Sequence, residues 1–457
     1  MQNRVERGQT ALLEPEARFS PASGIPPLPA GPGAASASIG NVSARGRIFR
    51  HPFAIAILFG LAALPLLWFR ITTPAVMFYD EGYFVPEAKV FIQGAQAPPQ
   101  EKPPLGKLLL SLGIRAAGDN ALGWRVASAV CGALALVAIF LWTYLLLRDT
   151  RLACLAAGLT VFNNFWFVMS RIGMMDAFLM LFLTWSLVAF TASLVLDVRV
   201  GVRRFLFCLS GVLIGLAGAC KWNAIDTLAV FFLVTFALVW IARRPMGNAN
   251  SSIAGCAEKI RQIGVPVLLL GLIAAPIASY SLAYWPLCKA IHRPFNVHEL
   301  IAMHISIWHF NSTTVSNPAI TLPWYAWPFN LNPQRGLSYL VGNPVVAWGG
   351  LAAMALCLRR FWKTFTFQEG LVFLLFAANY LQWAVTPEKG IFYYYYYPSV
   401  MILGVTIAVA LRSLPPRVFG LRISLLLLIA AATFFLRCYP QMAYLQAPWD
   451  CAFGCWP

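Results

Sequence analysis

Two acidic residues stand side by side after the first hydrophobic segment of the chain. They are Asp80 and Glu81, and the aromatic residues Phe78, Tyr79 and Tyr83 surround them. Because neighbouring negative charges repel, the pKa of one carboxyl rises toward the range that suits proton abstraction. The competing interpretation is a solvated turn; the aromatic neighbours count against it, because they suit sugar stacking or an interfacial belt equally. We take Asp80 as the candidate catalytic base and Glu81 as its catalytic partner, which positions or tunes it.

A basic segment stiffened by two prolines follows about twenty residues later. Residues 101–107 read Glu-Lys-Pro-Pro-Leu-Gly-Lys, and the prolines exclude a regular helix before Leu105. The pattern from Leu105 to Ala117 predicts an amphipathic helix that is too short to span a bilayer, so we expect it to lie in the membrane interface. Lys102 and Lys107 would then lie at the depth of a lipid phosphate, and both are candidate ligands of such a phosphate.

Other ionisable residues lie at the ends of hydrophobic segments. They are Arg125, Arg171, Asp176 and Lys221. Such groups are functional candidates by default, and we expect Arg125 and Arg171 to bind phosphate and Asp176 and Lys221 to support the site. For Arg171 and Asp176 the competing interpretation is an ion pair that holds two helices together. Tyr393 opens a run of five tyrosines, which is typical of an interfacial aromatic belt and offers a hydroxyl to a phosphate.

Composition places the whole chain in a membrane. Of its 457 residues, 59% are hydrophobic and 11% are charged, whereas soluble domains carry about 25% charged residues. Apolar segments of about 20 residues, long enough to cross a bilayer, recur along the chain. We count about eleven: 52–69, 121–147, 152–168, 174–196, 204–220, 224–242, 263–285, 341–358, 368–386, 395–411 and 420–436. The sequence therefore predicts an all-α polytopic membrane protein with about eleven transmembrane helices.

The net charge of +17 follows the membrane topology. Arginine and lysine cluster in alternate short loops between the apolar segments, and loops of this kind face the cytoplasm. We therefore expect the N-terminus in the cytoplasm, the C-terminus outside, and the long segments 70–120 and 286–340 on the outer face. The candidate site then lies on the outer face of what we expect to be a bacterial inner (plasma) membrane. The basic charge indicates topology and no nucleic-acid partner.

The chain divides into five regions. Residues 1–48 are rich in Pro, Ala, Gly and Ser, a composition typical of disorder, and we expect a cytoplasmic tail there. The other regions are an N-terminal catalytic transmembrane module at 49–285 with its outer loop 70–120, an extracytoplasmic loop at 286–340, a C-terminal four-helix transmembrane region at 341–436 and an extracytoplasmic tail at 437–457. No small-residue cleavage site follows the first span, so we expect it to be retained.

No motif indicates a cofactor. The ten cysteines form no CxxC pair, and the chain has no GxGxxG after a strand, no P-loop and no Asp-x-Asp, so a soluble nucleotide-sugar donor has no evident site. His298, His304 and His309 leave a metal site open as an alternative, without the spacing of a known metal motif. We expect no cofactor, and a divalent metal is not indicated. Three cysteines beyond the last span leave an outer disulfide open: Cys438, Cys451 and Cys455.

In their order along the chain, these motifs resemble those of the protein O-mannosyltransferases. The resemblance rests on Asp80-Glu81, the Pro-Pro-Leu-Gly-Lys run at 103–107, Arg125 and the Ser-Arg-x-x-x-x-Asp run that ends at Asp176. Later landmarks are Lys221-Trp222-Asn223, Pro323-Trp324, Trp327-Pro328 and Gly342-Asn343-Pro344. The resemblance runs from about residue 52 to residue 436. Enzymes of this family have the GT-C glycosyltransferase fold and use polyprenyl-phosphate sugars.

Two departures from the family pattern concern the acceptor. Lys102 stands where the mannosyltransferases usually show a histidine, and Lys-Pro-Pro is more similar to relatives that transfer aminoarabinose from undecaprenyl phosphate to lipid A. Segment 286–340 is also too short to hold the soluble MIR domain of the eukaryotic enzymes. The resemblance therefore supports the reaction class better than it supports the acceptor.

The resemblance implies transfer of a sugar, mannose first among the candidates, from a polyprenyl-phosphate donor to Ser or Thr hydroxyls of secreted proteins, with inversion. Asp80 would accept the hydroxyl proton, and Arg125, Lys102, Lys107 or Arg171 would stabilise the leaving phosphate. Transfer to lipid A or another envelope glycan is the alternative. A transporter or flippase is a remote alternative, because the charges collect on one face and no paired Gly/Pro-interrupted spans occur. The expected partners are the lipid-linked donor, the acceptor and membrane lipids.

Overall fold

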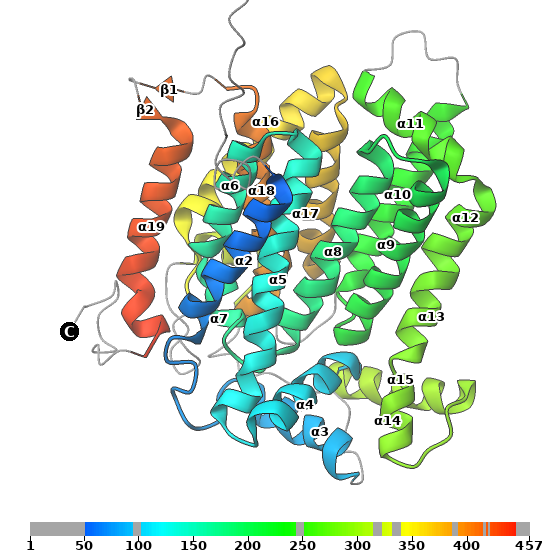
Figure 1. Ribbon diagram of the computed structural model, residues 1–457, viewed down its shortest axis with the longest axis vertical. Coiled ribbons are helices and arrows are strands. Elements are labelled where there is room, and N and C mark those ends of the chain that lie inside the picture. The colour runs from blue at the N-terminus through cyan, green and yellow to red at the C-terminus, as the bar shows by residue number, and fades with distance from the viewer. Residues whose placement is uncertain are drawn as a thin grey trace, which may run out of the picture.

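The computed structural model describes residues 51–94, 102–243, 251–313, 322–330, 340–385, 392–414, 417–418 and 421–444. These residues form a bundle of long helices that run side by side, with several shorter helices lying across one end (Figure 1). Within the described residues the strands are the two-residue pair β1 (Arg417–Val418) and β2 (Leu421–Arg422), which are antiparallel. The predicted all-α fold is confirmed.

Eight segments of the described chain are long and apolar enough to cross a membrane, by length and composition. They are α5 (Ala121–Leu147), α8 (Met175–Val195), α9 (Val200–Cys220), α10 (Ala224–Ala242), the segment Val265–Ala290, α16 (Pro344–Thr364), Tyr393–Leu411 (η4, Tyr393–Tyr396, with α18, Tyr397–Leu411) and α19 (Ile423–Met442). The remaining predicted spans fall on the shorter apolar helices α2 (Pro52–Trp68) and α6 (Thr150–Val161) and on α17 (Phe367–Val385). The polytopic architecture is confirmed, and the count of eleven spans stays a prediction.

Two of the predicted spans are interrupted helices. In the first, α6 ends at Val161 and α7 (Asn164–Met169) follows, and the Asn343 side chain donates to the freed carbonyl of Phe162 at 2.8 Å. In the second, α12 (Val265–Leu269) passes through a π-helical turn η1 (Leu270–Ala274) into α13 (Ala275–Leu282). Pro276 lies directly after that turn, and its missing N–H accounts for the widened turn.

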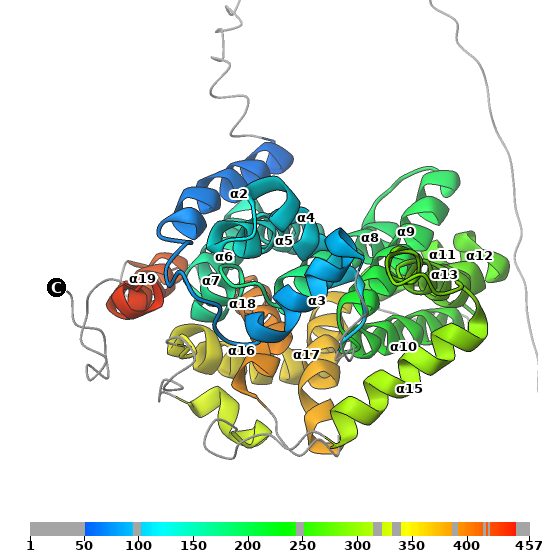
Figure 2. The same ribbon diagram turned by 90° about the horizontal axis from the view of Figure 1, so that it is seen from below.

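The shorter helices gather at one end of the bundle, which we call the α3–α4 end (Figure 1). They are α3 (Glu81–Gln93), α4 (Leu105–Ala117), α14 (Trp285–Ala290) and α15 (Val297–Thr313). Helix α4 has the predicted bounds, and Gly106 lets it lie close to α8, because a Cβ there would be 2.5 Å from Sδ of Met175. Seen from below, α3 crosses the middle of the bundle and α15 runs along its rim (Figure 2).

Several predicted regions fall partly or wholly outside the described residues. The tail 1–48 lies outside them, as does most of 437–457 with Cys451 and Cys455, so the outer disulfide stays a prediction. Within 286–340 the structure describes α15, the end of α14 and the 3-10 turn η3 (Trp324–Phe329). Helix α11 (Ser251–Ile263) lies at the end of the bundle opposite to α3 and α4 (Figure 1).

Candidate active site

Asp80 stands at the start of α3, where the chain turns from the loop after α2 into the helix. The hydroxyl of Tyr394 donates a 2.8 Å hydrogen bond to its Oδ2. Burial raises the pKa of Asp80, while the hydrogen bond from Tyr394 and the positive charges of Lys221 and Lys102 oppose this rise. Asp80 as a residue is partly exposed, while its carboxyl group lies in a largely buried setting. The pKa of the carboxyl is therefore moved toward that of a proton acceptor.

Glu81, the next residue, is buried and bound on all sides. Arg125 donates to both of its carboxylate oxygens, at 2.8 and 2.9 Å. The backbone N–H groups of Gly173 and Phe78 also donate to it, at 2.9 and 3.2 Å. Glu81 therefore ties the start of α3 to α5 and to the loop between α7 and α8, and it fixes the backbone that carries Asp80.

Arg125 has a partner for each of its five N–H groups. Besides Glu81, the guanidinium donates to the carbonyls of Ile71, Pro74 and Val76 at 2.9, 2.8 and 3.1 Å. Its charge also lies 4.9 Å from the centre of the Phe78 ring. The side chain is 1% exposed. Arg125 holds the loop that leads to Asp80, and its predicted contact with a phosphate stays a prediction.

Lys221 and Asp176 form a buried ion pair beside Tyr394. Lys221 Nζ donates to Asp176 Oδ1 at 2.8 Å and lies over the rings of Tyr395 and Tyr394, 4.3 and 5.2 Å from their centres. Both charges act on Asp80, since Lys221 lowers its pKa and Asp176 raises it. The structure thus brings these two predicted supporting residues together with the candidate base.

Lys102 and Lys107 have different surroundings. Lys107 is fully buried, donates to the carbonyl of Lys102 at 2.7 Å and pairs with Glu87 of α3 at 2.5 Å. Lys102 is half-buried, donates to Asn311 of α15 at 2.6 Å, and its charge acts on Asp80. Lys107 therefore joins α4 to α3, and Lys102 is the lysine of this segment whose charge acts on the candidate base.

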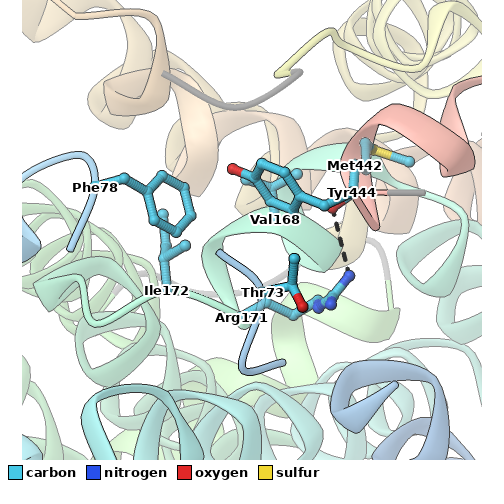
Figure 3. Close-up of a pocket in the computed structure, with 7 residues that line it drawn as sticks. All are labelled: Thr73, Phe78, Val168, Arg171, Ile172, Met442 and Tyr444. Atoms are coloured by element: carbon cyan, nitrogen blue, oxygen red, sulfur yellow. Dashed lines mark hydrogen bonds between the residues drawn. The ribbon is translucent and has the colours of Figure 1, made fainter. Parts of the chain in front are cut away.

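Arg171 lies in a separate position, between the ends of α2 and α19. Its guanidinium donates to the carbonyl of Phe69 at 2.6 Å and to that of Met442 at 3.4 Å, and it lies over the ring of Phe167. Burial lowers its pKa to about 10, which leaves it charged at neutral pH. Figure 3 shows it in the wall of a small cavity, lined by Thr73, Phe78, Val168, Arg171, Ile172, Met442 and Tyr444. Its predicted phosphate contact stays a prediction.

The run of five tyrosines contributes Tyr394, which the sequence did not single out. Tyr393, the predicted residue, is buried; its hydroxyl accepts from the N–H of Gly342 at 3.0 Å and its ring packs on Phe165. The 3-10 turn η4 (Tyr393–Tyr396) gives successive rings different directions, so neighbouring residues have different partners. Five identical residues in a row carry no signal that separates them, and the turn decides which hydroxyl reaches Asp80.

The sequence also missed a polar cluster on α13 and α15. His304 Nδ1 donates to the carbonyl of Leu300 at 2.6 Å, so in the neutral ring Nε2 accepts from Tyr280 at 2.6 Å. Tyr280 in turn accepts from Trp222 at 2.9 Å. Over the described part of the chain, no three His, Cys, Asp or Glu residues gather as a metal site would require. His304 therefore serves to hold α15 against α13.

Comparison with known proteins agrees with this arrangement. Residues 56–292 match the family of dolichyl-phosphate-mannose-protein mannosyltransferases. The polyprenol-phosphate-mannose–protein mannosyltransferase of Mycolicibacterium smegmatis is 25% identical over 409 residues, which cover 73% of this chain and 75% of the relative. The protein of the same name from Mycobacterium tuberculosis is 23% identical over 389 residues, covering 71% and 73%.

Several solved structures have the same fold, and two of them represent different enzymes. One is the Saccharomyces cerevisiae protein O-mannosyltransferase Pmt1–Pmt2 complex bound to the sugar donor, with a TM-score of 0.71, 13% identity and coverage of 88% of this chain and 90% of that one. The other is ArnT from Cupriavidus metallidurans bound to undecaprenyl phosphate, with a TM-score of 0.55, 15% identity and coverage of 85% and 74%. These likenesses confirm the predicted GT-C fold. The chain belongs to the dolichyl-phosphate-mannose-protein mannosyltransferase family and is an integral membrane glycosyltransferase.

Proposed function

We propose that this chain transfers mannose from a polyprenyl-phosphate donor to Ser or Thr hydroxyls of secreted proteins, with Asp80 as the base. The family supports the donor and the acceptor class. The observation that carries the proposal is the carboxylate of the partly exposed residue Asp80, which accepts a hydrogen bond from Tyr394. It lies within the electrostatic reach of Lys221 and Lys102. Such a group can accept a proton at a site where nearby cations stabilise the negative charge that develops on the leaving group.

The proposed reaction is a single displacement. The acceptor oxygen attacks the anomeric carbon, and the bond from that carbon to the phosphate oxygen breaks as the new carbon–oxygen bond forms. Its electron pair leaves with polyprenyl phosphate, and the hydroxyl proton passes to Asp80. Attack from the face opposite to the leaving group inverts the anomeric configuration. Negative charge grows on the phosphate as the bond breaks, so a nearby cation stabilises the transition state more than the ground state.

Among the cationic candidates, the contacts favour Lys102 as the phosphate ligand and Lys221 as a second charge near Asp80. Lys102 is half-buried and acts on Asp80, whereas Lys107 is buried in its pair with Glu87. The five donors of Arg125 are engaged within the protein. We therefore assign positioning roles to Arg125, Glu81 and Lys107. Loss of one such charge-stabilising donor typically costs about 10²–10³ in rate.

We further propose that the α3–α4 end faces the outside of a bacterial inner membrane, with the N-terminus in the cytoplasm. The clusters of arginine and lysine in the alternate loops support this orientation. The bacterial origin of the relatives supports a bacterial inner membrane as the location. In intact cells or spheroplasts, a membrane-impermeant thiol reagent should modify a cysteine placed at Ser306 on α15. It should reach a cysteine at Arg261 on α11 only after the membrane is permeabilised, and the reverse pattern would refute the orientation.

The function itself is tested by transfer of label from radiolabelled polyprenyl-phosphate mannose in purified membranes. Wild type is compared with Asp80→Asn and with Asp119→Asn, an exposed carboxylate at the same end that pairs with Lys89. Label in the protein fraction that requires Asp80 and not Asp119 supports the proposal. Asp80-dependent label in the lipid or glycan fraction would replace the protein acceptor with an envelope glycan. Full turnover by Asp80→Asn would end the assignment of the base.

A further inference from the structure

Helix α15 lies across the α3–α4 end, along the rim of the bundle and past the end of α10 (Figure 2). Its inner face carries Leu300, Met303, His304, Ile307 and Asn311 at helical spacing. Met303 and Ile307 are buried, and Leu300 packs with Met303 against residues of α3 and α14. Hydrogen bonds of His304 to Tyr280 and of Lys102 to Asn311 fasten this face to α13 and to the segment before α4.

A second face of α15 is apolar and exposed. Val297, Ile301, Ile305 and Trp308 are 73, 54, 61 and 64% exposed, and their spacing of four, four and three residues places them in one stripe. The third face holds polar side chains such as Ser306, which is also exposed. A helix with one face on protein, one apolar and one polar fits a position where protein, lipid and water meet.

We propose that the stripe Val297–Ile301–Ile305–Trp308 lies in the headgroup layer of the bilayer, and that this membrane contact positions Lys102 through Asn311. The membrane-crossing segment before α15 also exposes apolar side chains, since Ile277, Leu282 and Trp285 are 60, 62 and 53% exposed. Next to these, the Lys289 ammonium lies 5.5 Å from the centre of the Trp285 ring. Tryptophan and lysine at the end of a span are typical of the headgroup layer.

The link to the reaction rests on the proposed function. Asn311 accepts from Lys102 at 2.6 Å, and Lys102 is one of the charges that act on Asp80. The donor is itself a lipid, so its phosphate lies in the headgroup layer that α15 contacts. The bilayer would fix the depth of α15, and α15 would fix the position of Lys102 through Asn311. The lysine would then lie at the depth of the donor phosphate.

The contact of α15 with the bilayer is tested without any enzymatic readout. The photoreactive residue p-benzoylphenylalanine is placed at Ile305, at Trp308 or at Ser306 in the full chain, which is reconstituted in nanodiscs of phosphatidylethanolamine and phosphatidylglycerol. After illumination, mass spectrometry should find phospholipid adducts at Ile305 and Trp308 and at least fivefold fewer at Ser306. Crosslinks between two copies of the chain would overturn the proposal in favour of a dimer. Equal or no adducts at the three positions would also overturn it.

The coupling to Lys102 is tested by kinetics with the lipid donor. The double variant Ile305→Gln/Trp308→Gln and the single variant Asn311→Ala should each raise the donor KM roughly tenfold, and Lys102→Ala should add little to either. Ile305→Leu/Trp308→Phe, which keeps the stripe apolar, and Ser306→Gln should retain the wild-type KM. An unchanged KM in Asn311→Ala would refute the coupling. If the wild type itself transfers no mannose, the proposed function fails, while the lipid adducts still test whether α15 contacts the bilayer.

Discussion

The hydroxyl of Tyr394 donates to Oδ2 of Asp80 at 2.8 Å, which joins two residues 314 positions apart. The bond connects the start of α3, in the first long loop after α2, with the turn that opens α18. It stabilises the charged form of the carboxyl and so opposes the effect of burial on its pKa. The C-terminal part of the chain thereby takes part in tuning a base that the N-terminal part provides.

Tyr394→Phe should raise the pKa of Asp80 further, because the bond that favours its charged form is lost. The active enzyme has Asp80 deprotonated, so the acidic limb of the pH profile of kcat/KM should move to higher pH, with lower activity at neutral pH. Tyr393→Phe is the matched control, because its hydroxyl contacts Gly342 instead. It should change stability and leave the acidic limb in place. An unshifted limb in Tyr394→Phe would remove the tyrosine from the tuning of the base.

Lys221 and Asp176 should move the same limb in opposite directions. The charge of Lys221 lowers the pKa of Asp80, so Lys221→Met should shift the limb to higher pH. Asp176 raises that pKa, so Asp176→Asn should shift the limb to lower pH. Both variants break a buried ion pair and should unfold at lower temperature than the wild type. Shifts of the same sign in both variants would show that unfolding, not charge, causes them.

The pair Glu81–Arg125 should behave as a structural unit. Glu81→Gln or Arg125→Met alone leaves an uncompensated charge in a buried site, which typically costs about 3–5 kcal/mol. The double variant Glu81→Gln/Arg125→Met removes both charges and should be more stable than the sum of the single losses predicts. Thermal unfolding of the four purified proteins in one detergent measures the cycle. If the double variant loses as much stability as the two single variants together, Glu81 and Arg125 do not act as a structural unit.

Lys102 and Lys107 should separate binding from stability. Lys102→Ala should raise the donor KM and lower kcat with little change in Tm, because Lys102 is half-buried and its charge acts on the candidate base. Lys107→Ala leaves Glu87 without its buried cation and should lower Tm, while correctly folded enzyme keeps its kcat. Activity per folded molecule and Tm are measured on the same preparations. Equal kcat losses in both variants would refute the division of roles.

Local patterns predicted the elements whose signal is local. The prolines before Leu105 and the apolar face after it gave α4 its observed bounds, Leu105–Ala117. Helix α3 was not predicted, because Pro86 and the polar residues around it resemble a loop, and its stability comes from packing on α4 and α14. The interruption after Val161 was also missed, since the partner that satisfies it, Asn343, lies far along the chain.

The composition of the site was more predictable than the roles within it. Asp80, Glu81, Asp176 and Lys221 were named from type and position, and the structure gathers them. Lys102 and Lys107 look alike in the sequence, and only the distant partners Asn311 and the α3 residue Glu87 distinguish them. Three of the five hydrogen bonds that Arg125 donates go to carbonyls of a loop whose path no local pattern specifies.

That loop has no helix or strand of its own between Ile71 and Phe78. The guanidinium of Arg125 sets its shape, because it donates to the carbonyls of residues 71, 74 and 76 and also binds Glu81 beyond the loop. The number of residues between the first span and the base is therefore fixed. Adding or removing a single residue there would shift every carbonyl relative to Arg125, so this loop should tolerate changes in side chain far better than changes in length.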